Sequence, residues 1–168
     1  MLTKEDLQQN LSRTDEWIRA ADQKVSIFLA FQGVILTILA PTVLQWFKEN
    51  YYFITCAQFY LIAFGILLAL VGLAESAVAI IPRLKNKSSK KSILYFGQIA
   101  EFDLSDYKKK ITGTSEEEYK EEIINQIHVL SGIALKKHRH FRNSIVLFLL
   151  GLGLLLGGYV CFVTSYGY

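Results

Sequence analysis

Three long apolar segments dominate the pattern of hydrophobic and polar positions along the chain. They cover residues 25–47, 53–81 and 144–166. The first contains only small or weakly polar interruptions, such as Gln32 and Pro41, the second contains one charge, Glu75, and the third contains none. A helix of about 20 apolar residues is long enough to cross the hydrocarbon core of a bilayer. The pattern therefore predicts three transmembrane helices.

The N-terminal segment, residues 1–24, also has a helical period. From Leu7 to Phe28, apolar and small residues recur at alternating spacings of four and three, which is one face of a helix. No Gly or Pro interrupts this stripe where it enters the first apolar segment. We therefore expect a cytoplasmic amphipathic helix that begins near Thr3 and continues into the first span. Its polar start is unlike a signal peptide.

The segment between the second and third spans, residues 83–142, is expected to be helical as well. The pattern predicts a helix over about residues 92–102 and a linker with one helical turn over residues 103–114. Ser115 and Glu118 form a capping box, in which each side chain satisfies a free backbone N–H group at a helix start. Four-and-three spacing then runs from Tyr119 to Ile145. This predicts a single helix from about Glu116 to the end of the third span.

Composition and charge agree with a membrane protein of separated apolar and polar blocks. Hydrophobic residues make up 52% of the 168 residues and the mean hydropathy is +0.29, yet 20% of the residues are charged. This combination argues against a simple soluble enzyme and a disordered tail. Two cysteines, Cys56 and Cys161, are too few for a disulfide scaffold. We expect them to be apolar filler rather than a disulfide. A net charge of +3 does not favour a nucleic-acid partner.

The distribution of basic residues predicts the orientation in the membrane. Most of the 18 Lys and Arg residues lie in residues 83–142 and in the N-terminal segment, whereas the loop between the first two spans has only Lys48. Cytoplasmic flanks are enriched in Lys and Arg. We therefore expect a cytoplasmic N-terminus, a cytoplasmic segment 83–142 and a C-terminus outside.

The sequence contains no catalytic arrangement that predicts an enzyme. A phosphate-binding glycine loop is absent, and an intramembrane enzyme is the weakest interpretation because the spans lack a second acid, a Ser/His pair or a metal-ligand set. His138 and His140 are two residues apart, so they point to nearly opposite sides of a helix and cannot share a metal. They lie among basic residues, and we expect them to contact lipid headgroups. No metal site is predicted.

Two polar residues within the spans are candidates for a role inside the membrane. Gln32 and Glu75 are expected at similar depth, because each lies about two turns from the cytoplasmic end of its span. A charge inside the membrane is costly and usually faces protein or water. We hypothesise that the two side chains face each other in a bundle or line a pore. The alternative is a protonated or snorkelling Glu75 without function. Gly153 and Gly157 form a GxxxG pair, which predicts close helix packing.

Three stretches of the sequence resemble the transmembrane Pycsar effector family. The first is EWIRAADQK, residues 16–24, directly before the first span. The second is SILYFGQIA, residues 92–100, and the third is residues 119–126, followed by Ser131, Ile133 and the pair Lys136–Lys137. Their order and spacing also match. Each stretch alone is a weak signal, and together they are fairly specific.

The resemblance implies a small helical membrane protein of bacterial antiphage defence. A partner pyrimidine cyclase makes cyclic CMP or cyclic UMP on infection, and the effector impairs the inner membrane. A site for such a nucleotide must be built from cytoplasmic helices, because the chain is too short for a β-roll nucleotide-binding domain. Basic side chains suit the phosphate and aromatic side chains suit the base. The ligand-binding candidates are Arg19, Asp22, Lys24, Tyr95, Phe96, Gln126, Ser131 and Lys137, with fold-building as the alternative role for each.

Two functions therefore remain open on the sequence. One is an all-α membrane effector that is gated by a cyclic pyrimidine nucleotide. Such an effector would assemble as a homo-oligomer, because one three-span chain cannot enclose a wide pore. The N-terminal stripe and the GxxxG pair would supply interfaces. The other is a constitutive small channel or membrane scaffold without a nucleotide ligand.

Overall fold

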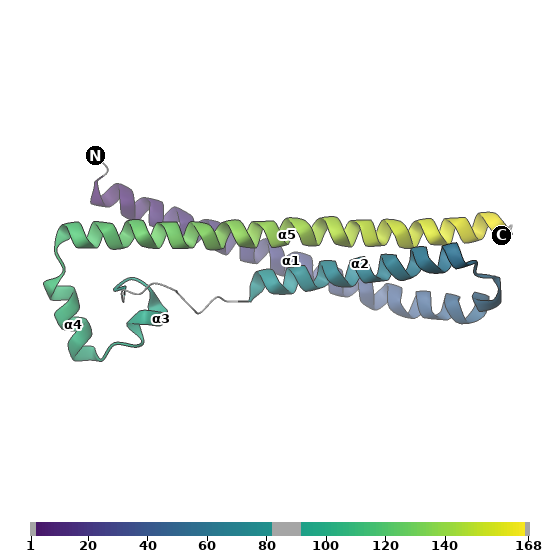
Figure 1. Cartoon of the computed structure of the whole chain (residues 1–168), viewed down its shortest axis with the longest axis horizontal. Coiled ribbons are helices and arrows are strands. Elements are labelled where there is room, and N and C mark those ends of the chain that lie inside the picture. The colour runs from purple at the N-terminus through teal and green to yellow at the C-terminus, as the bar shows by residue number, and fades with distance from the viewer. Residues whose placement is uncertain (1–2, 82–91, 167–168) are drawn as a thin grey trace. The chain divides into compact units, whose positions relative to one another are not determined.

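The chain is all-helical over the residues that the structure, a computed structural model, describes: 3–81 and 92–166. These residues form three long helices and three short ones, and Figure 1 labels α1 to α5. The long helices are α1 (Lys4–Asn50), α2 (Cys56–Ile80) and α5 (Glu116–Tyr166). The short ones are the 3₁₀ helix η1 (Tyr51–Phe53), α3 (Phe96–Ile99) and α4 (Leu104–Gly113). The basic cluster of residues 83–91 lies outside the described residues.

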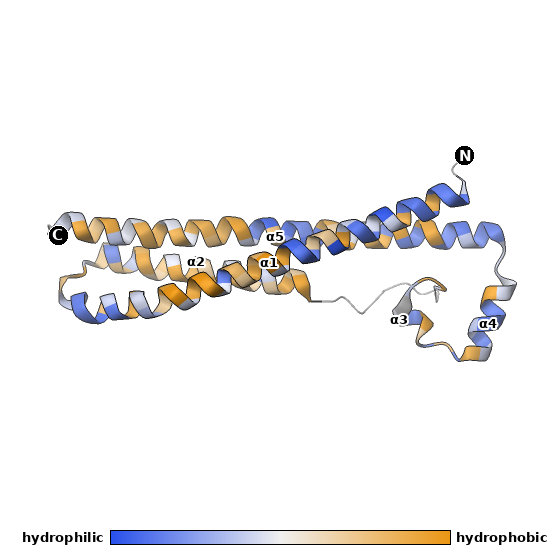
Figure 2. Cartoon of the chain, turned by 180° about the vertical axis from the view of Figure 1, so that it is seen from behind, coloured by the Kyte–Doolittle hydropathy of each residue, from blue (hydrophilic) through white to orange (hydrophobic). Residues whose placement is uncertain are grey.

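All three long helices are long and apolar enough to cross a membrane. Figure 2 shows that α2 is hydrophobic along most of its length, whereas α5 changes from a largely hydrophilic start to a hydrophobic C-terminal half. The prediction of three membrane-spanning helices is therefore confirmed. The predicted continuity of α1 and α5 across their polar and apolar parts is confirmed too.

Each long helix begins with a reciprocal capping box. Thr3 and Asp6 exchange hydrogen bonds at the start of α1, Thr55 and Gln58 at the start of α2, and Ser115 and Glu118 at the start of α5. In each pair, both side chains bind the partner's backbone N–H group, which otherwise has no acceptor in the first turn. The predicted box at Ser115 is confirmed, with both bonds at 3.2 Å.

The segment before α5 differs from the sequence prediction. A helix was expected over residues 92–102, but only α3 is helical there, and the linker expected over residues 103–114 contains the ten-residue α4. Ser92 explains the late start of α3, because its backbone N–H donates to Gln98 Oε1 and its hydroxyl donates to Glu122 Oε2 at 2.6 Å. These tertiary hydrogen bonds compete with helix formation.

The described residues form two compact units. The polar unit contains Met1–Ala21 and Ile81–Lys136, and the apolar unit contains Asp22–Ile80 and Lys137–Tyr168. The stripe predicted on the N-terminal helix is buried within the chain in both units, at Leu7, Thr14 and Ala21 and then at Val25. It is therefore not the free subunit interface that the sequence suggested.

Aromatic side chains hold the three spans together at one end of the apolar unit. The rings of Trp46 in α1 and Phe162 in α5 lie 4.8 Å apart between centroids, in an edge-to-face arrangement. Tyr166, at the end of α5, donates its hydroxyl hydrogen bond to the carbonyl oxygen of Phe53 in the α1–α2 connection. We call this end, residues 46–58 and 159–166, the aromatic end.

Candidate functional site

The contact between α2 and α5 in the apolar unit is made by small residues. A Cβ atom added to Gly151 would lie 2.6 Å from the carbonyl oxygen of Gly65 and 2.7 Å from the backbone nitrogen of Ala69. One added to Gly72 would lie 2.9 Å from the backbone nitrogen of Phe148. The two backbones therefore touch, which is possible only without side chains at these positions.

The GxxxG pair that the sequence singled out does not make this contact. A Cβ atom at Gly153 or Gly157 would have no neighbour within 4 Å in the described chain. Both residues are exposed on the other side of α5. Their role between subunits stays a prediction.

A hydrogen-bonded polar cluster continues the α2–α5 contact toward the start of the third span. Ser144 is its centre and is fully buried. Its hydroxyl donates to the carbonyl oxygen of Gly72 at 2.6 Å and accepts from Gln32 Nε2 at 3.1 Å. The hydroxyl of Ser76 lies 2.5 Å away. Since the single hydroxyl hydrogen of Ser144 goes to Gly72, Ser76 is the donor to Ser144.

One polar atom of this cluster is left without a partner. Gln32 is fully buried, and its Oε1 is a buried side-chain oxygen with no hydrogen bond in the described structure. A buried acceptor without a donor costs about 1–3 kcal/mol relative to the same atom in water. The cluster is therefore not completely satisfied in this arrangement.

Glu75 and His140 form a second contact between α2 and α5. His140 Nδ1 lies 2.6 Å from Glu75 Oε2, and about 29% and 28% of the two side chains are exposed. The sequence predicted that Glu75 and Gln32 face each other or line a pore. No hydrogen bond joins them among the described residues, and the pore alternative stays a prediction. Each binds α5 instead. The ring of His140 is bonded to Glu75 through Nδ1, and the expected contact of His140 with headgroups stays a prediction. We call Gln32, Gly72, Glu75, Ser76, His140 and Ser144 together the polar seam.

A salt bridge between α1 and α5 lies one turn before His140. Lys137 Nζ contacts Asp22 Oδ1, and only 12% of the Lys137 side chain is exposed. Lys137, His140 and Ser144 follow one another at spacings of three and four, so they lie on one face of α5. This face carries polar groups over two turns and then continues with the buried Phe148 and Gly151.

The sequence-predicted ligand residues are divided between the two units. Arg19, Tyr95, Phe96, Gln126 and Ser131 belong to the polar unit, and Asp22, Lys24 and Lys137 belong to the apolar unit. Asp22 and Lys137 are brought together as a salt bridge, Tyr95 is buried, and Arg19, Lys24 and Ser131 are exposed. The side chain of Phe96 lies outside what the structure describes. Their role in binding stays a prediction.

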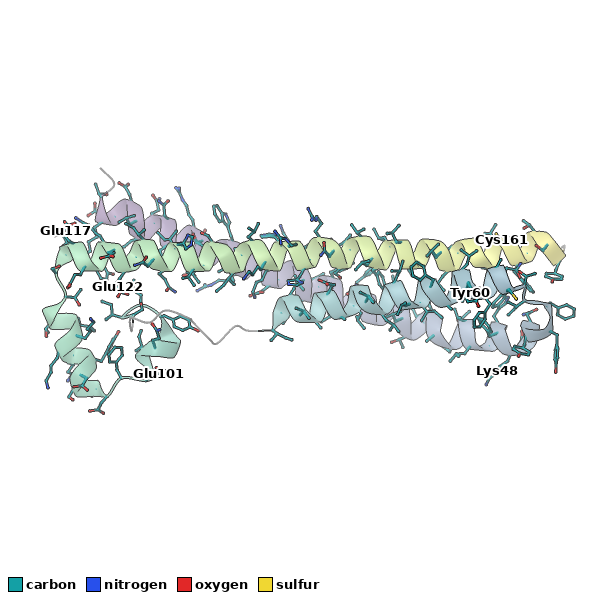
Figure 3. All side chains as sticks on the ribbon, in the orientation of Figure 1. Lys48, Tyr60, Glu101, Glu117, Glu122 and Cys161 are labelled. Atoms are coloured by element: carbon teal, nitrogen blue, oxygen red, sulfur yellow. The ribbon has the colours of Figure 1, made fainter. Side chains whose placement is uncertain are left out.

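The polar unit contains a cavity of about 460 Å³ that the sequence did not indicate. Six of the residues around it carry polar side chains: Lys4, Tyr107, Thr114, Ser115, Glu116 and Tyr119. Lys4 Nζ lies 5.1 Å from the centre of the Tyr119 ring, a cation–π distance. Acidic side chains are also present in this unit, including Glu101, Glu117 and Glu122 (Figure 3).

Ser76, Ser144 and His140 are the site residues that sequence reasoning missed. Counting residues from the span ends did not indicate the contact of His140, because His140 lies one turn before the third span whereas Glu75 lies about two turns inside the second. Serines within apolar helices carried no signal either. Among residues 3–81 and 92–166, no group of three or more His, Cys, Asp or Glu side chains could hold a metal ion. Cys56 and Cys161 are free and exposed.

Comparison with known proteins agrees with this architecture. The family model PycTM, described as the Pycsar effector protein domain, matches residues 6–164. No match was found among curated proteins or solved structures. Because the family match spans nearly the whole chain and includes all three membrane-spanning helices, the protein belongs to the PycTM family and is a multi-pass membrane effector of the Pycsar antiphage system.

Proposed function

We propose that this protein is a non-enzymatic effector that makes the bacterial inner membrane permeable when it senses cyclic CMP or cyclic UMP. The nucleotide would come from a partner pyrimidine cyclase, and the result would be growth arrest or death of the infected cell. The polar seam is the observation that carries the proposal. Polar groups inside membrane helices are costly and typically mark a path for water or ions.

Several copies of the chain would have to assemble for this activity. Three spans that pack directly on one another leave no wide channel within one copy, so a permeable path requires a homo-oligomer. The distribution of Lys and Arg supports a cytoplasmic N-terminus and a C-terminus outside. A reporter that is active only outside the inner membrane should therefore work when fused to the C-terminus and fail when fused to the N-terminus.

The cavity of the polar unit has chemistry that suits a cyclic pyrimidine nucleotide. The ammonium group of Lys4 can bind the single phosphate charge, and the rings of Tyr107 and Tyr119 offer surfaces for stacking a base. The carboxylate of Glu116 can accept a hydrogen bond from a base N–H group. These groups support a binding site in the cytoplasmic helices.

Dye release from vesicles tests the proposal. Purified full-length protein is reconstituted in phosphatidylethanolamine/phosphatidylglycerol vesicles filled with a fluorescent dye, and cyclic CMP, cyclic UMP or cyclic AMP is added. Release with a pyrimidine nucleotide but not with cyclic AMP supports the proposal. Basal release together with no calorimetric binding of any nucleotide would favour a constitutive channel. Neither release nor binding would favour a membrane scaffold.

A matched pair of variants tests the cavity separately. Lys4→Met removes the proposed phosphate contact and should weaken nucleotide binding by about tenfold or more. Lys48→Met makes the same chemical change in the last turn of α1 and should leave binding unchanged. If Lys4→Met has no effect while Arg19→Met or Lys24→Met weakens binding, the nucleotide site lies at the residues that the sequence suggested.

A further inference from the structure

The α2–α5 contact has two halves with different physical character. Between Gly65, Ala69 and Gly151 the two backbones touch without polar side chains. Beyond them the same two helices are joined by the hydrogen bonds of Ser76 and Ser144 and by the Glu75–His140 pair. Only the second half depends on polar contacts, which water molecules can replace.

Separation of the helices at the polar seam has opposite consequences in lipid and in water. If α5 separated from α1 and α2 in hydrocarbon, the hydroxyl groups of Ser76 and Ser144 and the amide of Gln32 would lose these hydrogen bonds, and no water would be present to replace them. If they separated next to water, each group would be satisfied again. The seam therefore opposes opening to lipid far more than opening to an aqueous path.

The unpaired oxygen of Gln32 shifts this balance further. In the closed seam, Gln32 Oε1 is buried and has no donor among the described residues. A water molecule would supply that donor, so this atom gains a hydrogen bond only when water enters. The closed arrangement thus contains one polar atom that favours the hydrated one.

We propose that the polar seam is a water-binding surface that forms the lining of the permeation path. In the resting chain, Gln32, Ser76 and Ser144 satisfy most of one another's hydrogen bonds. In the active assembly, α5 moves away from α1 and α2 at this level, and the same groups face water. The inference rests on the proposed membrane-permeabilising function and identifies the residues through which it acts.

Two substitutions should change the activity in opposite directions. Ser144→Ala removes three hydrogen bonds of the closed seam, so half-maximal dye release should need about fivefold less protein than in the wild type. Gln32→Met keeps a similar side-chain volume but removes the atom that favours water, so release should need about fivefold more protein. Ser165→Ala is the control, because its hydroxyl bonds only to the carbonyl oxygen of Cys161 in its own helix. A merely structural role would shift Ser144→Ala and Gln32→Met in the same direction, which would overturn the proposal.

A reversible cross-link tests the movement itself. The hydroxyl oxygens of Ser76 and Ser144 are 2.5 Å apart, close to the disulfide S–S length of about 2.0 Å. The double variant Ser76→Cys/Ser144→Cys, made after Cys56→Ser and Cys161→Ser, should release at least tenfold less dye when oxidised than when reduced. Equal release in both states would overturn the seam proposal and leave the proposed function standing.

If the wild type releases no dye at all, thiol labelling separates the seam proposal from the proposed permeabilising function. That result overturns the proposed permeabilising function. The seam is then tested by the single thiol that Ser144→Cys introduces, in the same cysteine-free background, with a charged, water-soluble maleimide. Labelling that Gln32→Met lowers about fivefold supports a water-binding seam. Absence of labelling with and without cyclic nucleotide overturns it.

Discussion

Gly151 offers the sharpest test of how the membrane helices pack. Its hydrogen atom faces the carbonyl oxygen of Gly65 and the backbone of Ala69, and a Cβ atom there would meet backbone atoms at 2.6 and 2.7 Å. Backbone atoms cannot rotate away as a flexible side chain can. The substitution Gly151→Ala should therefore force α2 and α5 apart.

The size of this effect follows from the distances. The Cβ–oxygen separation must grow from 2.6 Å to the 3.4 Å at which ordinary contact begins, a movement of roughly 0.8 Å. A gap of about 0.5–1 Å forfeits a quarter to a half of the dispersion energy of the atoms that face it. Overpacking of this kind costs about 1–3 kcal/mol, so we expect Gly151→Ala to lower the free energy of unfolding by about 2 kcal/mol.

Gly153→Ala is the matched control in the same helix. It makes the same chemical change two residues away, at a position whose Cβ would have no neighbour within 4 Å. Alanine favours a helix over glycine by about 1 kcal/mol, so this variant should be unchanged or slightly more stable. The measurement is the loss of helical circular dichroism with rising SDS fraction in mild detergent micelles, at protein concentrations where the chain is monomeric.

Equal destabilisation by the two variants would refute the packing described here. It would mean that the face of α5 with Gly153 is packed as tightly as the face with Gly151. If instead Gly153→Ala leaves the monomer stable but weakens cross-linking between copies in vesicles, the GxxxG pair acts between subunits, as the sequence suggested.

Three further predictions concern the salt bridge and the helix starts. Asp22→Asn should destabilise the protein by about 1–3 kcal/mol, and more than Lys137→Met, because it leaves a largely buried ammonium group without a counter-charge whereas water reaches Asp22; denaturation in SDS micelles checks the order. Ser115→Ala should cost about 1 kcal/mol, and faster amide hydrogen exchange in the first turn of α5 would report it. Hydrogen bonds from the backbone and the hydroxyl of Thr3 lower the pKa of Asp6, so the start of α1 should stay protected above the pKa of an unfolded Asp, about 3.9. That protection should disappear as the pH falls through the lower folded pKa, and protection unchanged at pH 2 would contradict the assignment.

The long helices could be predicted because local signals agree along their whole length. Apolar segments of membrane-spanning length, four-and-three spacing and the capping box at Ser115 all favour the same structure, and they identified α1, α2 and α5. Residues 92–114 were harder, because there the outcome depends on tertiary hydrogen bonds. Ser92 binds Glu122, which is 30 residues away in sequence, and no local pattern contains that contact.

The candidate site was only partly predictable for a similar reason. Counting residues from the ends of the apolar segments placed Gln32 and Glu75 inside the membrane. The count could not show which faces of the three helices meet. The rotation of α5 decides that Gly151 rather than Gly153 touches α2, and that His140 rather than Gln32 receives Glu75. A single helix sequence contains no information about its own rotation against a partner.

The aromatic end gives the apolar unit a mechanical asymmetry. There, Trp46 packs on Phe162, and Tyr166 is bonded to the connection between α1 and α2, so all three spans are fastened together. The contacts that water can loosen, the polar seam and the Asp22–Lys137 pair, lie toward the opposite end of the same helices. The helices can therefore pivot about the aromatic end. A small separation there corresponds to a much larger one at the polar seam, so a modest tilt of α5 suffices to open the seam.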